Sequence, residues 1–219
     1  MIEVVGVGAG GHAKVVVEIV QLIDRYSIVG LLDADIKKKG TELLNVPILG
    51  DDSLLSELYQ RGVRHAFVAL GSIDIGSRRR SVYEMLTQLN FEVIAAVHSS
   101  AVISKSARLG NGVTVMATAV INANSEIGHN VIINTGTIVE HDCVVGDHVH
   151  IATGASLAGN VTVGTGSHIG AGAVVLQGRT IGENSIIGAG AVVVRDVPDD
   201  VVVMGVPARV YKRTSEVEA

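Results

Sequence analysis

The chain has 219 residues, a formal net charge of −5 at pH 7 and a single cysteine, so one large or two small domains fit its length and an internal disulfide is excluded. The acidic balance and the lack of long basic runs argue against nucleic-acid binding, and no apolar run approaches the roughly 18 residues that span a bilayer. Hydrophobic residues make up 47% of the chain and aromatic residues only 3%, which predicts a core of small and β-branched aliphatic side chains.

The first residues of the chain lack the basic segment of a secretion signal. We therefore expect a cytoplasmic protein with no membrane partner. The longest basic runs, residues 37–39 and 78–80, are expected to lie on solvated surface.

Residues 1–94 alternate between strand and helix patterns. Strands are predicted over residues 2–8, 27–33, 65–71 and 91–96, and helices over residues 13–26, 51–62 and 77–90. This alternation predicts a small, parallel, doubly wound sheet of about four strands, the α/β architecture of a Rossmann-like domain.

A glycine-rich loop follows the first predicted strand. Residues 6–11 satisfy the G-x-G-x-x-G pattern between a strand and a helix, and Asp33 ends the next strand. Such a loop lets backbone N–H groups approach a phosphate at the helix N-terminus. Alone, the pattern also fits an NAD-binding redox or sensor module. A domain of about four strands is half of what a dinucleotide usually spans, so a nucleotide-linked sugar is the preferred ligand.

Residues 95–219 follow a different period. An aliphatic residue recurs at every sixth position from Val97 to Val193, seventeen times in all. Three hexads close one triangular coil, so residues i and i+18 stack at the inter-strand spacing of about 4.8 Å. The repeat predicts an all-β parallel β-helix followed by a C-terminal tail, with a local bulge at Arg179, whereas an ordinary β-sandwich would show turns every 8–12 residues.

Three motifs carry a resemblance to a known family. The hexads followed by MGVPARV (204–210) resemble the left-handed β-helix acyltransferases. With GAGGH (8–12) and NTGTIVEHDC (134–143) added, the whole chain resembles the sialic acid O-acetyltransferase and UDP-4-amino-sugar N-acetyltransferase subfamily of surface-glycan pathways. The resemblance implies a left-handed coil, acetyl-CoA as donor, a nucleotide-sugar acceptor, and a homotrimer with sites between subunits.

His141 is the candidate base for acetyl transfer, which needs a proton acceptor for the attacking group. Stacking by 18 residues puts Ala123 below His141 and Gly159 above it, so the imidazole faces a slot between small residues. Asp142 can orient the imidazole. The resemblance implies the same roles for His141 and Asp142, while the alternative interpretation is a solvated turn histidine.

The remaining candidate residues come mainly from the resemblance. It implies acetyl-CoA contacts from His150, Gly159, Ala171, Gly205, Pro207 and Ala208. It implies acceptor contacts from Gly8, Gly10, Gly11, His12, Asp33 and Asn134, and the carboxyl edge of the sheet adds Gly71 and Arg78.

Four alternatives stay open at these positions. His12 can cap the first helix instead of contacting the acceptor, and Arg78 can be a plain surface residue. His150 and His168 lie one coil apart, but two histidines alone are weak evidence for a metal, and we expect none. Cys143 occupies an inward position and is expected to pack rather than to react.

The function that the resemblance implies is N-acetylation of a nucleotide-linked 4-amino-sugar by direct transfer from acetyl-CoA. O-acetylation of sialic acid, an NAD-binding module and an inactive structural solenoid remain the alternatives. The solenoid predicts tolerance of His141→Ala, whereas the enzyme predicts loss of turnover with the fold intact.

Overall fold

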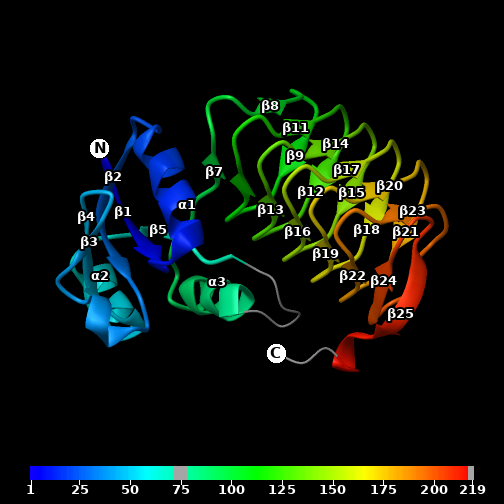
Figure 1. Ribbon diagram of the computed structural model, residues 1–219. Helices are drawn as coiled ribbons and strands as arrows, with labels where there is room; N and C mark the ends of the chain where they lie inside the picture. Colours follow the sequence, from blue (N-terminus) through cyan, green and yellow to red (C-terminus); the bar gives the residue numbers. More distant parts are fainter. Residues whose placement is uncertain (72–77, 217–219) are drawn as a thin grey trace.

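The computed structural model describes residues 1–71 and 78–216 and has two parts, an α/β domain and a parallel β-helix (Figure 1). The sheet of the α/β domain has the order β3-β4-β2-β1-β5-β6, and only the β3–β4 pair is antiparallel. Its strands are β1 Ile2–Val7, β2 Tyr26–Leu32, β3 Glu42–Leu43, β4 Val46–Gly50, β5 His65–Val68 and β6 Glu92–Val93. Its helices are α1 Gly11–Gln21, α2 Leu55–Gln60 and α3 Arg78–Gln88, with 3₁₀ turns η1 Ile36–Lys38 and η2 Asp52–Leu54.

This sheet has six strands rather than the predicted four. The missed pair is the hairpin β3–β4, whose turn residues Leu44 and Asn45 have φ values of 51° and 63°. Pro47 and the short strands leave no clear alternating pattern there. Helix α1 ends at Gln21, short of the predicted residue 26, and the first turn of the helix predicted over 51–62 is η2. Residue 77, the predicted start of the third helix, lies outside the described residues.

Gly6 sits where strand β1 crosses the middle of this sheet. A Cβ atom at Gly6 would overlap the side chains of Phe67 and Leu31, which are both fully buried. We expect Gly6→Ala to lower the free energy of unfolding by about 1–3 kcal/mol, because packed side chains must shift. Denaturant unfolding measures this, with Gly11→Ala as control, since a Cβ at Gly11 meets nothing within 4 Å. Equal stability of the two variants would contradict the prediction.

The β-helix is built from seventeen two-residue strands, and the second residue of each is one of the predicted aliphatic positions. The strands are β7 Ala96–Val97, β8 Val102–Ile103, β9 Arg108–Leu109, β10 Thr114–Val115, β11 Val120–Ile121, β12 Glu126–Ile127, β13 Ile132–Ile133, β14 Ile138–Val139, β15 Val144–Val145, β16 His150–Ile151, β17 Ser156–Leu157, β18 Thr162–Val163, β19 His168–Ile169, β20 Val174–Val175, β21 Thr180–Ile181, β22 Ile186–Ile187 and β23 Val192–Val193.

These strands form three faces. The first face runs from β7 through β10, β13, β16, β19 and β22 to the closing hairpin of β24 Val201–Met204 and β25 Arg209–Arg213, which precedes the 3₁₀ turn η3 Thr214–Glu216. The second face holds β8, β11, β14, β17, β20 and β23, and the third holds β9, β12, β15, β18 and β21. Strand pairs such as Thr114 with Ile132 are 18 residues apart, as the stacking argument predicted.

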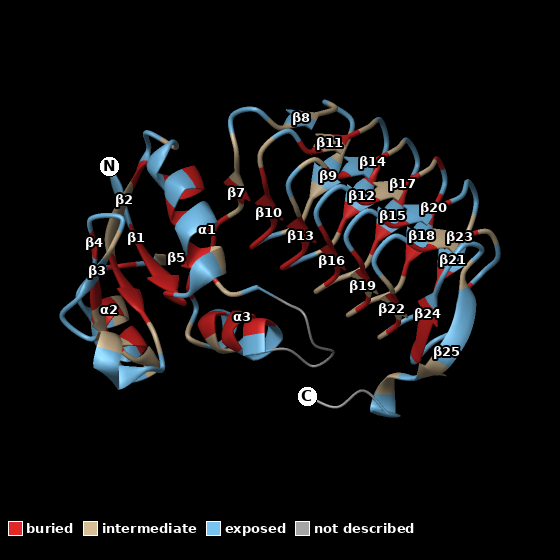
Figure 2. Cartoon of the chain, viewed as in Figure 1, coloured by how far each residue is buried: buried red, intermediate tan, exposed pale blue. Residues whose placement is uncertain are grey.

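Local chemistry explains why this repeat closes. From Gly112 to Gly190, every sixth residue lies on an edge between faces and has a positive φ, and most of these residues are Gly or Asn, which tolerate that conformation. Polar residues at inward positions bond to carbonyl oxygens 15 residues further along: Ser125 to Glu140, Thr137 to Ala152 and Ser167 to Gly182. Figure 2 shows buried residues repeating along each face and exposed residues at the edges.

The expected bulge at Arg179 is wrong. Strands β20 and β21 keep the regular pairing with no register shift. The Arg179 side chain points away from the interior of the β-helix, and its Nη1 lies 3.8 Å from Asp196 Oδ1. It therefore does not disturb the packing of the coils. Cys143 behaves as expected, buried and without a disulfide, with its Sγ 3.2 Å from the Ala158 oxygen.

The α/β domain packs against the start of the first face. Ala96, Met116 and Ile132 of the coils share one buried cluster with Ala13 and Val16 of α1, and Figure 1 shows α1 beside β7. The two parts are therefore held in one arrangement by apolar packing. Across the described ranges, no helix has the length and apolar character needed to cross a membrane.

Candidate active site

His141 and Asp142 lie on the edge between the second and third faces. His141 Nδ1 is 2.8 Å from Asp142 Oδ2, and both side chains are about half exposed. Asn124, one coil below, approaches the other carboxylate oxygen with its Nδ2 at 3.4 Å. An Nδ1–H donated to Asp142 leaves Nε2 as the basic nitrogen, so the pair presents a proton acceptor to solvent.

Asp142 is fixed by the backbone as well as by its hydrogen bonds. Its φ of 60° lies in the left-handed region, where Asp, Asn and Gly are favoured. The hydrogen bonds from His141 and then Asn124 lower the pKa of the Asp142 carboxyl below its ordinary value. Asp142 therefore stays ionised and keeps the imidazole oriented at neutral pH.

Gly159 lies directly above His141, as the 18-residue stacking predicted. A Cβ at Gly159 would come within 2.7 Å of His141 Cε1 and Nε2, so only a glycine leaves this room. In the part of the chain that the structure describes, the Gly159 N–H donates to no protein acceptor. A basic nitrogen and a free amide donor are thus brought together on one edge.

A second group of predicted residues meets at the carboxyl ends of β1, β2 and β5. Gly8, Asp33 and Arg78 line one small cavity together with Asp52 and Leu70. Arg78 Nη2 lies 3.7 Å from Asp52 Oδ2, and the Arg78 side chain is exposed. This is the edge at which open α/β sheets bind their ligands. Gly10 and Gly11 start α1 beside it, and a Cβ there would meet nothing.

Asp33 ties the glycine-rich loop to this cavity. Its Oδ2 accepts hydrogen bonds from the Ala9 N–H at 2.7 Å and from Lys38 Nζ at 2.9 Å, and its Oδ1 accepts from the Asp35 N–H. Partial burial acts to raise the pKa of the Asp33 carboxyl, but these hydrogen bonds outweigh it and hold the pKa below the ordinary value. Lys38, expected on solvated surface, is therefore part of the site.

A third group lies between the α/β domain and the first face. A Cβ built on Gly71 would lie 3.7 Å from the His12 side chain. Asn134 Nδ2 lies 3.2 Å from His150 Nε2, and the rings of His150 and His168 meet at 4.8 Å between centroids. His150 is therefore grouped with acceptor candidates rather than with Gly159.

His12 does not cap helix α1. The N-cap residue is Gly10, and no side chain caps this helix. Burial, then the charges of Arg79 and His150, lower the pKa of His12 to about 3, so its imidazole is neutral. His12 Nε2 is buried and, among the described residues, has no hydrogen-bond partner. A buried, unpaired nitrogen is costly unless a ligand satisfies it.

The other acetyl-CoA candidates lie on a different edge from Gly159. Ala171 is on the edge between the first and second faces, where its oxygen accepts from the Gly190 N–H. Gly205, Pro207 and Ala208 follow β24 on that same edge, and Val206–Pro207 is a cis peptide. Within one chain, the acetyl-CoA candidates therefore lie on two different edges, one on each side of the second face.

Comparisons with known proteins agree with this architecture. A model of the PglD N-terminal domain matches residues 3–86, and a model of the bacterial transferase hexapeptide (six repeats) matches residues 142–177. A search of curated proteins finds no match. Among solved structures, the chain is 44% identical to PerB from Caulobacter crescentus in complex with CoA and GDP-perosamine, covering 95% of this chain and 97% of that one, with a TM-score of 0.89.

Two further structures extend the likeness. The acetyltransferase domain of PglB from Neisseria gonorrhoeae is 36% identical, with 95% of this chain and 99% of that chain covered and a TM-score of 0.87. WeeI from Acinetobacter baumannii is 28% identical, with 96% and 100% covered and a TM-score of 0.84.

The chain belongs to the left-handed β-helix acetyltransferases. The predicted fold, a Rossmann-like α/β domain followed by a left-handed parallel β-helix, is confirmed with the family.

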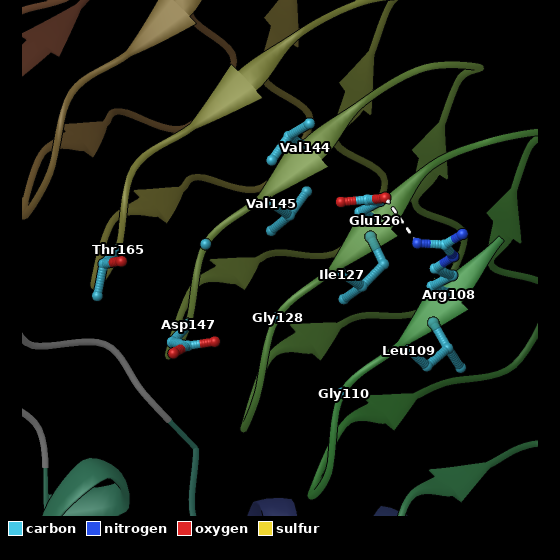
Figure 3. Close-up of a pocket in the computed structure, with 11 residues that line it drawn as sticks. Arg108, Leu109, Gly110, Glu126, Ile127, Gly128, Val144, Val145, Asp147 and Thr165 are labelled. Carbon is cyan, nitrogen blue, oxygen red and sulfur yellow. Dashed lines mark hydrogen bonds and ion pairs between the residues drawn. The ribbon is translucent and has the colours of Figure 1, made fainter.

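One cavity of this acetyltransferase contains none of the predicted site residues. It is an open groove of about 460 Å³ on the third face, lined by Arg108, Glu126, Val144, Asp147, Thr165 and their neighbours. Figure 3 shows the ion pair between Arg108 and Glu126, two of the residues that line it. This groove lies apart from the candidate chemistry, because His141 Nε2 and the Gly159 N–H lie on the neighbouring edge.

Sequence reasoning missed Asp52, Lys38 and Arg79. Asp52 and Lys38 belong to 3₁₀ turns, which have no periodic signal. Arg79 is fully buried although its run of arginines was expected on the surface. The spacing of the sequence did indicate this burial. One face of the helix, at positions i, i+3, i+4 and i+7, is formed by Arg79, Val82, Tyr83 and Leu86.

Proposed function

We propose that this acetyltransferase moves the acetyl group of acetyl-CoA to the 4-amino group of a nucleotide-linked sugar, with a GDP-linked sugar as the first candidate. The observation that carries the proposal is the His141–Asp142 pair beside the free Gly159 amide, in a chain that also has a glycine-rich, nucleotide-type pocket. The likeness to PerB, which was solved with CoA and GDP-perosamine, supports both substrates.

The pocket of the α/β domain binds the acceptor. Backbone N–H groups of the loop that precedes α1 face the diphosphate, while Asp33 holds that loop through the Ala9 N–H. His12 and Asn134 extend the contact surface toward the coils. The unpaired His12 Nε2 supplies a hydrogen bond to the acceptor.

His141 then takes the proton from the attacking amine. Asp142 holds Nδ1–H, so Nε2 receives the proton as the nitrogen attacks the thioester carbon. The Gly159 N–H donates to the thioester oxygen as negative charge develops on it. The C–S bond then breaks, and the CoA thiolate takes the proton from His141 Nε2 and leaves as the free thiol. Burial raises the pKa of the Cys143 thiol, which argues against an acyl-enzyme and for direct transfer. Two solved variants of the perosamine N-acetyltransferase replace a histidine by asparagine or alanine, which supports a central histidine in that enzyme.

The working unit is proposed to be a homotrimer with acetyl-CoA held between subunits. Gly159 and Ala171 lie on opposite edges of the second face, and a neighbouring copy can bring such edges together. The second face also leaves Val102, Ile138 and Val174 exposed, by 62%, 39% and 36%. A regular stripe of exposed aliphatic residues is favourable in water only when another surface covers it.

We expect Ile138→Arg to break this assembly. A charge in the middle of the second face would be buried without a partner, so the variant should sediment as a monomer and lose acetyl-CoA binding. Analytical ultracentrifugation and calorimetry measure both effects. Leu22→Arg, at the exposed end of α1, is the control and should remain assembled. An Ile138→Arg protein that stays trimeric would exclude the second face from the interface.

Turnover with a panel of acceptors tests the proposed function. Release of free thiol from acetyl-CoA is followed with GDP-, UDP- and dTDP-linked 4-amino-sugars and with sialic acid. Activity on a nucleotide-linked 4-amino-sugar is expected, strongest with GDP. Activity on sialic acid alone would replace the proposal by O-acetylation. No thiol release with any of these sugars would contradict the proposed function and favour a binding module or a structural solenoid. NAD binding would then be measured.

The proposed location is the cytoplasm, because acetyl-CoA and nucleotide-linked sugars are both made there. Fractionation of cells that express the chain, with detection by antibody, tests this location.

A further inference from the structure

Arg79 of helix α3 is a fully buried cation that joins the two parts of the chain. Its five N–H donors each meet an acceptor. On the side of the α/β domain, Nη1 donates to the oxygens of Val68 at 3.0 Å and Leu70 at 2.7 Å. On the side of the coils, Nε donates to the Asn130 oxygen at 3.4 Å, and Nη2 donates to the Gly112 oxygen at 3.3 Å and Thr114 Oγ1 at 3.4 Å.

The charge of Arg79 is balanced by dipoles rather than by a carboxylate. Within residues 1–71 and 78–216, no acidic side chain forms an ion pair with it. Burial lowers the pKa of Arg79 to about 9, so the guanidinium remains protonated at neutral pH. A buried cation without a carboxylate is expensive for stability, which points to a positional role at this junction.

One of the carbonyl groups that accept hydrogen bonds from Arg79 belongs to the proposed site of the nucleotide-linked sugar. Leu70, whose oxygen receives the shortest of the five hydrogen bonds, lines the small cavity with Gly8 and Asp33. The next residue, Gly71, lies beside His12, because a Cβ built on Gly71 would be 3.7 Å from the His12 side chain. The charge of Arg79 also contributes to keeping His12 neutral. One side chain therefore fixes the end of β5, the acceptor cavity and the first face relative to one another.

We infer that Arg79 is a positioning residue for the nucleotide-linked acceptor: its guanidinium holds residues 68–70, at the carboxyl end of β5, against the coils, so that the acceptor pocket and His12 keep a fixed place above the first face. The inference rests on the proposed function only for the identity of the acceptor. All five donors of Arg79 are committed to protein acceptors, so Arg79 itself touches no substrate. Its effect must appear in acceptor binding and not in acetyl-CoA binding.

Arg79→Lys tests this role, because lysine keeps the charge but cannot reproduce the planar fork of five donors. We expect the KM for the acceptor to rise by about tenfold or more, with kcat and the KM for acetyl-CoA changing by less than about threefold. Arg80→Lys is the matched control, since Arg80 is exposed on the same helix and, among the residues that the structure describes, its ion pair is with Glu84. A merely structural loss would lower the active fraction and leave both KM values unchanged.

Binding of GDP by calorimetry separates this inference from the proposed function. Wild type that binds GDP but acetylates no sugar would contradict the proposed function. In that case, a tenfold weaker affinity of Arg79→Lys for GDP would still support the positioning role. If Arg79→Lys does not fold, Thr114→Val removes one coil-side acceptor and keeps the charge, and we expect about two- to fivefold weaker acceptor binding. Unchanged acceptor KM and GDP affinity in the folded variant would overturn the inference.

Discussion

His141→Ala should lower kcat for acetyl transfer by roughly 10²- to 10⁴-fold, the usual contribution of a general base. The side chain is half exposed and, within the described ranges, its one side-chain hydrogen bond is to Asp142, so the unfolding temperature should hardly change. Steady-state kinetics with free-thiol detection measure kcat, and thermal unfolding measures stability.

His129→Ala is the matched control for this substitution. His129 follows Ile127 by two residues, as His141 follows Val139, and its Nδ1 accepts the Asn111 N–H. Its role is therefore local support of a turn, and its replacement should leave kcat within about twofold. Equal kcat in wild type and His141→Ala would remove His141 from the mechanism and favour the structural solenoid.

Gly159→Ala should lower kcat by about 10²-fold by displacing the base rather than removing it. The new methyl group would stand 2.7 Å from His141 Cε1 and Nε2. Because the half-exposed ring can rotate into solvent, the free energy of unfolding should change by less than about 0.5 kcal/mol. The Gly159 φ is one that alanine adopts, since it is absent from the positive-φ glycines.

A double-mutant cycle separates this effect from damage to the amide donor. Alanine keeps the N–H at residue 159, so Gly159→Ala should cost little further activity once His141 is already alanine. Full additivity of the two losses would mean that Gly159 acts independently of His141, and the proposed displacement would be wrong.

The β-helix was predictable almost residue by residue. Each inward aliphatic residue contacts the residues 18 positions away, so the stacking rule alone put Gly159 over His141 and Asn124 beneath Asp142. The α/β domain gave a weaker signal. Its hairpin β3–β4 and its 3₁₀ turns have no period, and the 3₁₀ turns supply Asp52 to the lining of the small cavity and Lys38 as a hydrogen-bond donor to Asp33.

The burial of Arg79 could not be predicted from composition. A run of three arginines is normally solvated, and here only the middle one is buried, because helical spacing turns it toward the coils. His12 carries the same lesson, since its lowered pKa depends on burial and on the charges of Arg79 and His150, which lie far along the chain. The edge positions of Gly159 and Ala171 follow from the hexad phase, but the second copy that would unite them leaves no periodic trace in the sequence.

Transfer of a ¹³C-labelled acetyl group to GDP-perosamine is the most direct test of the account. Mass spectrometry and NMR of the product identify the atom that receives the label, in wild type and in His141→Ala. The account predicts an amide on the sugar 4-amino nitrogen with wild type and almost none with the variant. Label on a hydroxyl oxygen, or equal product from the two proteins, would contradict it.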